Sequence, residues 1–176
     1  MRRQGLIVLS YPIGLSGQTV HLLPAVTEVF GAHRQMKWWQ RESGGMLFAR
    51  IENKDIFVVE ATPPQMQDIR SRFGFTIAKA EAQAKIDAKH AAGLHYLGEW
   101  HTHPEAVPTP SRRDEATMSS RVRQSSHQLN GFIFAIVGRG EFPAALAVLA
   151  HDGSSWHQLS ALPSGAQEIS ELHGLR

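Results

Sequence analysis

Cysteine is absent from the 176 residues of this chain. A chain without thiols has no disulfide scaffold, no cysteine nucleophile, no iron–sulfur cluster and no thiolate zinc site. Any metal must therefore be held by histidine, aspartate or glutamate. Long hydrophobic runs are also missing: the longest, residues 132–137 and 144–150, are far shorter than the roughly 20 residues that span a bilayer. These absences exclude a disulfide-built protein and predict no membrane helix.

Charge of one sign is not in large excess either. The 18 basic and 16 acidic side chains give a net charge of +2, and the arginines are scattered along the chain. We therefore expect no nucleic-acid partner. The apolar stretch that follows Arg2 and Arg3 is interrupted by Tyr11 and Pro12 before it reaches the length of a signal peptide. This start predicts a first strand in a cytoplasmic protein.

The chain shows no repeat and no low-complexity linker, which predicts one domain over residues 1–160 and a tail or short helix over 161–176. Helical spacing or composition predicts helices over 24–33, 77–92 and 112–125, with Pro24 in a first turn and Gly93 as a stop. β-rich segments predict strands over 6–10, 18–22, 44–51, 55–61, 94–100, 132–137, 144–151 and 156–159. Residues 65–74 have weak periodicity and are predicted as a loop.

Two histidines stand one residue apart at the end of a predicted strand. His101 and His103 lie on the same side of an extended chain, because side chains alternate with a period of two. Asp114, in the first turn of the following helix, can return to them as a third ligand. Two imidazoles and a carboxylate form an open three-ligand zinc site with room for water. A His-x-His pair by itself is more often a surface or core pair than a metal site. The residues around it are therefore needed to choose between these two interpretations.

The whole segment from Gly98 to Asp114, GEWHTHPEAVPTPSRRD, resembles the motif of the JAMM (JAB/MPN) metallopeptidase family. It contains both histidines, the following proline, a Pro-x-Pro-Ser stretch and an aspartate at the family's spacing. The resemblance implies that His101, His103 and Asp114 hold Zn²⁺. It also implies an α/β fold, a curved central β-sheet flanked by helices, similar to zinc cytidine deaminases.

The family places a catalytic glutamate upstream on its own strand, followed by small residues, and Glu42-Ser43-Gly44-Gly45 fits that pattern. A carboxylate beside zinc-bound water can accept its proton and pass it to the leaving amine. Glu52 and Glu60 are competing candidates, but Glu52 is predicted in a turn and Glu60 lacks small neighbours. The structural alternative for Glu42 is an exposed glutamate at a strand edge.

Ser111 has two predicted roles. It is placed to cap the next helix, and the resemblance implies that its hydroxyl steadies an oxyanion; one oxygen cannot fully serve both at once. Thr102 and Trp100 are predicted to pack in the interior, although Trp100 could instead wall a cleft. The paired Trp38 and Trp39 could bind a partner, but they are predicted as core and rim. Three further histidines are not predicted as ligands: His95, His127 and His151.

JAMM enzymes cleave peptide or isopeptide bonds after the C-terminus of ubiquitin-like proteins. The residues of the motif resemble those of the bacterial branch associated with antiviral CBASS operons. This resemblance implies a substrate in which a cyclic-nucleotide synthase (CD-NTase) is joined through its C-terminus to another molecule. Three alternatives stand beside this reading. One is a general peptidase for ubiquitin-like proteins, and another is a non-catalytic MPN scaffold, which would be expected to lack some ligands. The third is a deaminase-like hydrolase, whose usual signature needs cysteine.

Overall fold

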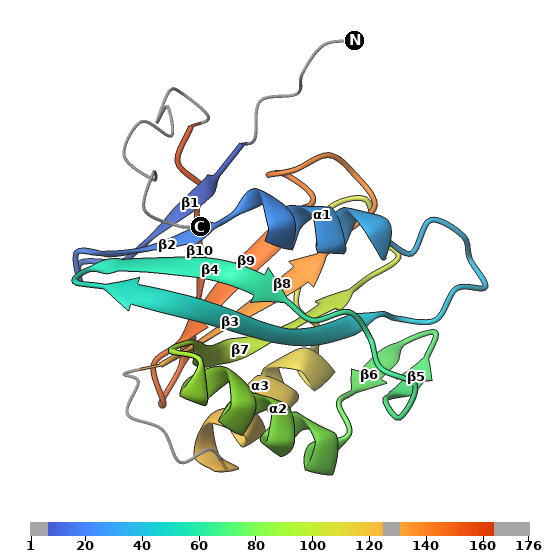
Figure 1. Cartoon of the computed structure of the whole chain (residues 1–176). Coiled ribbons are helices and arrows are strands. Elements are labelled where there is room, and N and C mark those ends of the chain that lie inside the picture. The colour runs from blue at the N-terminus through green and yellow to red at the C-terminus, as the bar shows by residue number, and fades with distance from the viewer. Residues whose placement is uncertain (1–6, 125–130, 164–176) are drawn as a thin grey trace, which may run out of the picture.

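One curved, mixed β-sheet organises the chain (Figure 1). This computed structural model describes residues 7–124 and 131–163. Within them eight strands pair in the order β1-β2-β4-β3-β7-β8-β9-β10; neighbours are antiparallel except for the parallel pairs β2–β4 and β7–β8. The strands are β1 (Leu9–Ile13), β2 (Gln18–Leu22), β3 (Gly44–Glu52), β4 (Asp55–Ala61), β7 (His95–Thr102), β8 (Phe132–Val137), β9 (Leu146–His151) and β10 (Trp156–Leu159). The α/β class and the curved sheet are as predicted.

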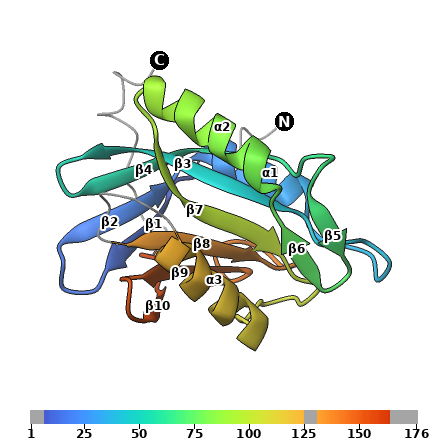
Figure 2. The same ribbon diagram turned by 90° about the horizontal axis from the view of Figure 1, so that it is seen from below.

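Helices cover both faces of the sheet. α1 (Pro24–Ala32) lies on one face, and α2 (Lys79–Ala91) and α3 (Arg112–Gln124) lie on the other (Figures 1 and 2). α1 buries Val26 and Phe30 in the main core, where the Phe30 ring packs 5.1 Å from that of Trp100. α3 buries Met118 and Val122 against β8 and β9. The start of α3 lies beside the end of β7, where Asp114 Oδ1 is 3.1 Å from His101 Nε2.

Local sequence signals account for one end of each helix. Pro24 occupies the first turn of α1, where its missing N–H costs nothing. Gly93 follows α2 with φ +80°, a conformation that side chains with a Cβ disfavour. Ser111 immediately precedes α3, as its predicted capping role requires. Each predicted helix is found within about two residues of its expected ends, as far as the described residues extend.

Two local predictions are wrong. The predicted loop 65–74 contains β5 (Ile69–Ser71), which pairs with β6 (Gly74–Thr76) in a separate two-stranded sheet. Strands of three residues are too short for a period of two to be detected. The first strand begins at Leu9 rather than residue 6 and runs through Pro12. A proline is tolerated there because β1 is an edge strand in the order of the sheet.

Some predictions fall outside the described part of the chain. Residues 164–176, most of the predicted tail, are among these, as are Ser125 and His127. In the described residues, no helix has the length and hydrophobicity needed to cross a membrane.

Candidate active site

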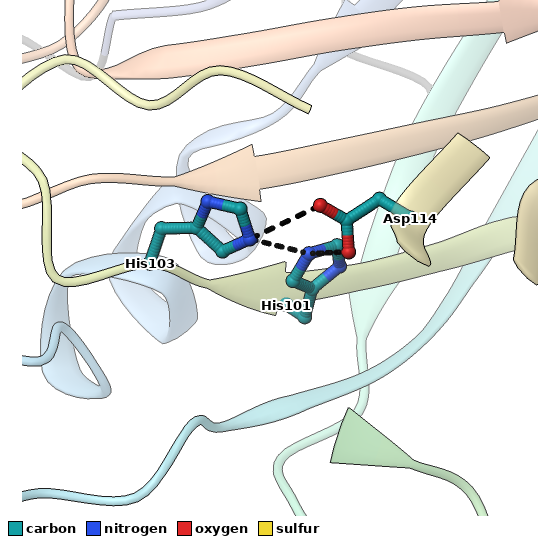
Figure 3. Close-up of side chains that lie close together, drawn as sticks. All are labelled: His101, His103 and Asp114. Carbon is teal, nitrogen blue, oxygen red and sulfur yellow. Dashed lines mark hydrogen bonds and ion pairs between the residues drawn. The ribbon is translucent and has the colours of Figure 1, made fainter. Parts of the chain in front are cut away.

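The structure brings the three predicted metal ligands together. His101 is near the end of β7, His103 follows that strand, and Asp114 is in the first turn of α3 (Figure 3). The His101 Nε2 atom lies 3.1 Å from both His103 Nε2 and Asp114 Oδ1, and His103 Nε2 lies 3.3 Å from Asp114 Oδ2. The backbone N–H of His103 donates to Val137 O of β8 at 2.9 Å, which continues the ladder past the end of β7. The sheet thus fixes both histidines.

The donor set fits a metal ion. Zinc bonds of about 2.0–2.1 Å in a tetrahedron separate neighbouring donors by about 3.3 Å, close to the distances between these nitrogens and oxygens. One ligand atom from each of the three side chains lies within 4.8 Å of the others. Two imidazole nitrogens only 3.1 Å apart need a shared proton or a shared cation between them. His101, His103 and Asp114 could therefore hold a metal and leave one position open.

The pKa values of Asp114 and His103 are shifted in the directions expected for a site that binds a cation. Burial by itself raises the pKa of Asp114, but hydrogen bonds from His101 and His103 outweigh it and hold that pKa well below its usual range. Burial is the largest single effect on the pKa of His103 and lowers it, but the hydrogen bonds and charges of the neighbouring carboxylates, Asp114 first among them, together raise it above its ordinary value. Glu105, whose Oε2 lies 3.2 Å from His103 Nδ1, acts in the same direction. The site is therefore built to attract positive charge.

Glu42 lies beside this group. It precedes β3 by two residues, as the predicted strand over residues 44–51 requires, whereas the resemblance implied a glutamate on a strand. Only 5% of its residue surface is exposed. Burial raises the pKa of its carboxyl, although His101 and His103 oppose that rise. A carboxyl with a raised pKa is suited to accept and return a proton near neutral pH. The alternative of an exposed strand-edge glutamate does not hold.

Glu42 and the metal-ligand group line the same cavity, of about 190 Å³. Phe73, Phe75 and Arg113 contribute to its wall. The two competing glutamates lie elsewhere. Glu52 ends β3 opposite Asp55, and Glu60 is paired with Lys89. Glu42 is thus the one of the three candidate glutamates that reaches the cavity.

Ser111 also lines the cavity, and it caps α3. The Asp114 N–H donates to Ser111 Oγ at 3.2 Å, while the Ser111 N–H donates to Asp114 Oδ2 at 2.7 Å, a reciprocal capping arrangement. The Ser111 hydroxyl itself donates to Asp114 Oδ2 at 2.6 Å. This confirms the capping role. The hydroxyl would have to leave Asp114 before it could donate to an oxyanion.

The other singled-out side chains divide between core and surface. Thr102 is fully buried, and so is Trp100, whose Nε1 donates to Thr62 O at 3.0 Å. Trp100 is a core residue that also borders the cavity. The prediction of a core position is wrong for Trp38 and Trp39, which are 70% and 59% exposed and contact each other edge to face. Among the described residues, His95 and His151 are not part of the group that could hold a metal.

Sequence reasoning missed three residues around the site. Arg70 donates to the main chain of Glu42, Gln35 accepts a hydrogen bond from Thr102, and Arg113 donates to Phe73 O. Their partners are 28, 67 and 40 positions away in the sequence. No local pattern marks such contacts. Only the position of Arg113 next to Asp114 hinted at a role near the site.

Comparison with known proteins places the chain in a family. Residues 24–154 match the family of prokaryotic homologs of the JAB domain, and the chain belongs to that family. This confirms the family predicted from the motif.

Individual relatives agree with this assignment. A CD-NTase/cGAS isopeptidase of Vibrio cholerae is 32% identical over 114 residues, which cover 63% of this chain and 70% of that protein. A CD-NTase/cGAS isopeptidase of Pseudomonas aeruginosa is 29% identical over 138 residues, 77% of this chain and 87% of that protein. The solution structure of a Desulfitobacterium hafniense protein has the same fold, with a TM-score of 0.55, 18% identity, and coverage of 76% of this chain and 84% of that one.

Proposed function

We propose that this protein is a zinc-dependent isopeptidase that releases a protein conjugated through its C-terminus. The observation that carries the proposal is the triangle formed by His101, His103 and Asp114, which shares one cavity with the buried carboxyl of Glu42. Three metal ligands without a nearby proton acceptor would be typical of a structural metal site. Three metal ligands beside the carboxyl of Glu42 are typical of a hydrolytic site.

In the proposed mechanism His101, His103 and Asp114 hold Zn²⁺, which would polarise the scissile carbonyl and lower the pKa of its water. Glu42 accepts the proton of the attacking water and delivers it to the leaving amine. Burial supports the role of Glu42 as a base, because a raised pKa makes its carboxylate a stronger proton acceptor than an ordinary glutamate. Ser111, on the same cavity, donates its hydroxyl to the developing oxyanion once it is released from Asp114.

The proposed substrate is a CD-NTase-type or ubiquitin-like protein joined by an amide to a target. The names of the Vibrio and Pseudomonas relatives support the CD-NTase. In this proposal the enzyme acts in the cytoplasm and reverses conjugation in bacterial antiviral (CBASS) signalling. A small cavity favours a narrow C-terminal tail, because larger side chains would clash there.

The test is a cleavage assay on two matched fusions, in which the C-terminus of a CD-NTase or of a ubiquitin-like protein is joined to a reporter. We expect wild-type protein loaded with about one zinc per chain to release the reporter from the CD-NTase fusion. Glu42→Gln should keep its zinc and lose at least about 100-fold in rate, because a positioned general base contributes on the order of 10²–10⁴-fold.

Glu52→Gln is the matched control, since Glu52 lies at the far end of β3. It should retain both zinc and activity. Wild-type cleavage rates that persist in Glu42→Gln, or after the metal has been stripped, would contradict the mechanism. Preference for the ubiquitin-like fusion would keep the mechanism but favour the general processing peptidase. Zinc binding without cleavage of either fusion would favour the scaffold.

A further inference from the structure

The main chain of Glu42 is held by the strand β5. The Glu42 N–H donates to Ser71 O at 2.8 Å, and in return Arg70 Nε donates to Glu42 O at 2.6 Å. The second arm of the same guanidinium, Nη2, donates to Ser43 Oγ at 2.7 Å. The planar guanidinium of Arg70 therefore donates hydrogen bonds to two consecutive residues, Glu42 and Ser43. A lysine, with a single point charge, cannot reproduce this fork.

The β5–β6 hairpin also abuts both halves of the candidate site. A Cβ on Gly44 would lie 2.5 Å from the Phe75 ring of β6, so the hairpin packs directly onto the chain that follows Glu42. At the other end Arg113, next to Asp114, donates to Phe73 O at 3.1 Å. The hairpin thus spans from the Glu42 segment to the helix that carries Asp114.

A second set of contacts holds the same segment independently of Arg70. Thr102 Oγ1 accepts the Ser43 N–H at 2.9 Å and donates to Gln35 Oε1 at 3.2 Å. The Thr102 N–H donates to Ser43 O at 2.8 Å. Residue 43 is therefore tied to β7 even without the arginine. Loss of Arg70 should loosen Glu42 without unfolding the start of β3.

We propose that Arg70 is a positioning residue, which holds the backbone of Glu42 so that its carboxyl faces the metal-ligand group. This inference rests on the proposed function, in which Glu42 moves the proton. Misplacement of a catalytic group by about 1 Å can cost on the order of 100-fold in rate. Because proton transfer occurs in the transition state, the loss falls on kcat and leaves KM nearly unchanged.

The test compares Arg70→Ala and Arg70→Lys with Arg72→Ala in the full, zinc-loaded chain. Arg72 is two residues away on the same hairpin, but its guanidinium lies over the rings of Trp38 and Phe73. We expect kcat to fall at least tenfold in Arg70→Ala, with KM within twofold and zinc still near one per chain. Arg70→Lys should fall between Arg70→Ala and wild type. Arg72→Ala should keep the wild-type kcat.

Two further measurements separate positioning from general structural support. Millimolar guanidinium should restore part of the kcat of Arg70→Ala and none of that of Glu42→Gln. Backbone hydrogen exchange should be at least fivefold faster in Arg70→Ala for the peptide that contains Glu42, and unchanged for residues 98–103. This second measurement needs no substrate. If the wild type cleaved neither fusion, the proposed function would fail, while exchange would still show whether Arg70 holds Glu42.

Three results would overturn the proposal. The first is a wild-type kcat in Arg70→Ala together with unchanged exchange at Glu42. The second is a loss of activity that appears in KM alone, which would indicate substrate binding. The third is an equal loss of kcat in Arg72→Ala, which would indicate that the hairpin as a whole, and not the guanidinium of Arg70, is responsible.

Discussion

His103 lies between two carboxylates, and this position ties metal binding to pH. Asp114 and Glu105 raise its pKa above the ordinary value of 6.5 against the opposing effect of burial. Zinc binds only the neutral imidazole, so a proton must leave whenever His103 is protonated in the metal-free protein. Because the pKa is raised, that competition begins above pH 6.5. Zinc affinity should therefore fall by up to about tenfold per pH unit on acidification from pH 8 to pH 6.

Competition with a chelator at several pH values measures this dependence. Glu105→Gln provides the matched variant, since it removes one of the charges that raise the pKa of His103. Its fall in affinity should begin at a lower pH than in the wild type. An affinity that stays flat between pH 8 and pH 6 would show that His103 is already neutral throughout that range or is not a ligand.

At the residue scale, the sequence predicted the group that could hold a metal, because His101, His103 and Asp114 stand close together in one motif. The sequence also favoured Glu42 over the other two glutamates, and Glu42 lines the same cavity as the three ligands. It could not find Arg70, since an arginine that donates to a backbone carbonyl 28 positions away has no sequence pattern. Residues that stand close together in the sequence form a recognisable motif, whereas a residue that contacts them from a distant position does not.

At the scale of elements, one turn at the start of α3 combines a helix cap with side chains that line the cavity. Ser111 Oγ accepts the Asp114 N–H and lines the cavity. Asp114 Oδ2 accepts the Ser111 N–H, and the same carboxylate faces the histidines. Ser111→Ala and Ser111→Gly separate the capping role of Ser111 from its proposed role at the oxyanion. Both remove the hydroxyl, so both should lose at least tenfold in kcat if it serves the oxyanion. Glycine is a tolerable cap, so only the alanine variant should lose about 1 kcal/mol of unfolding free energy.

Urea unfolding and steady-state cleavage of the same two variants provide the measurement. A fall in kcat that follows stability, large for alanine and small for glycine, would mean that the hydroxyl acts only as a cap. Wild-type kcat in both variants would remove Ser111 from the proposed mechanism.

The elements that sequence predicted well are those with internal signals. Proline and glycine mark the ends of α1 and α2, and β8 is a continuous apolar run, buried along its whole length. β5 and β6 have no such signal, since each is three residues long and mostly exposed or half-buried. Their position depends on contacts with the Glu42 segment and α3, which are long-range.

For the whole molecule, the sheet is almost closed on itself. β1 and β10 are the two edge strands, and just beyond β10 the Leu162 N–H donates to Ser10 O of β1 at 2.8 Å. Ala161 also packs against the main core. The domain predicted to end at residue 160 thus has contacts as far as Leu162. Closure matters because an unpaired edge exposes backbone groups to other chains.

This closing hydrogen bond can be removed without a change in the rest of the sheet. Proline has no N–H, so Leu162→Pro cannot donate to Ser10, whereas Leu162→Ala retains the donor and removes only a half-exposed side chain. We expect the proline variant to lose about 1 kcal/mol of unfolding free energy relative to the alanine variant, the typical net worth of one hydrogen bond. Urea unfolding of both variants, with faster amide exchange in β1 of the proline variant alone, measures the effect. Equal midpoints and equal exchange would mean that the two edges are held together by core packing and not by the backbone.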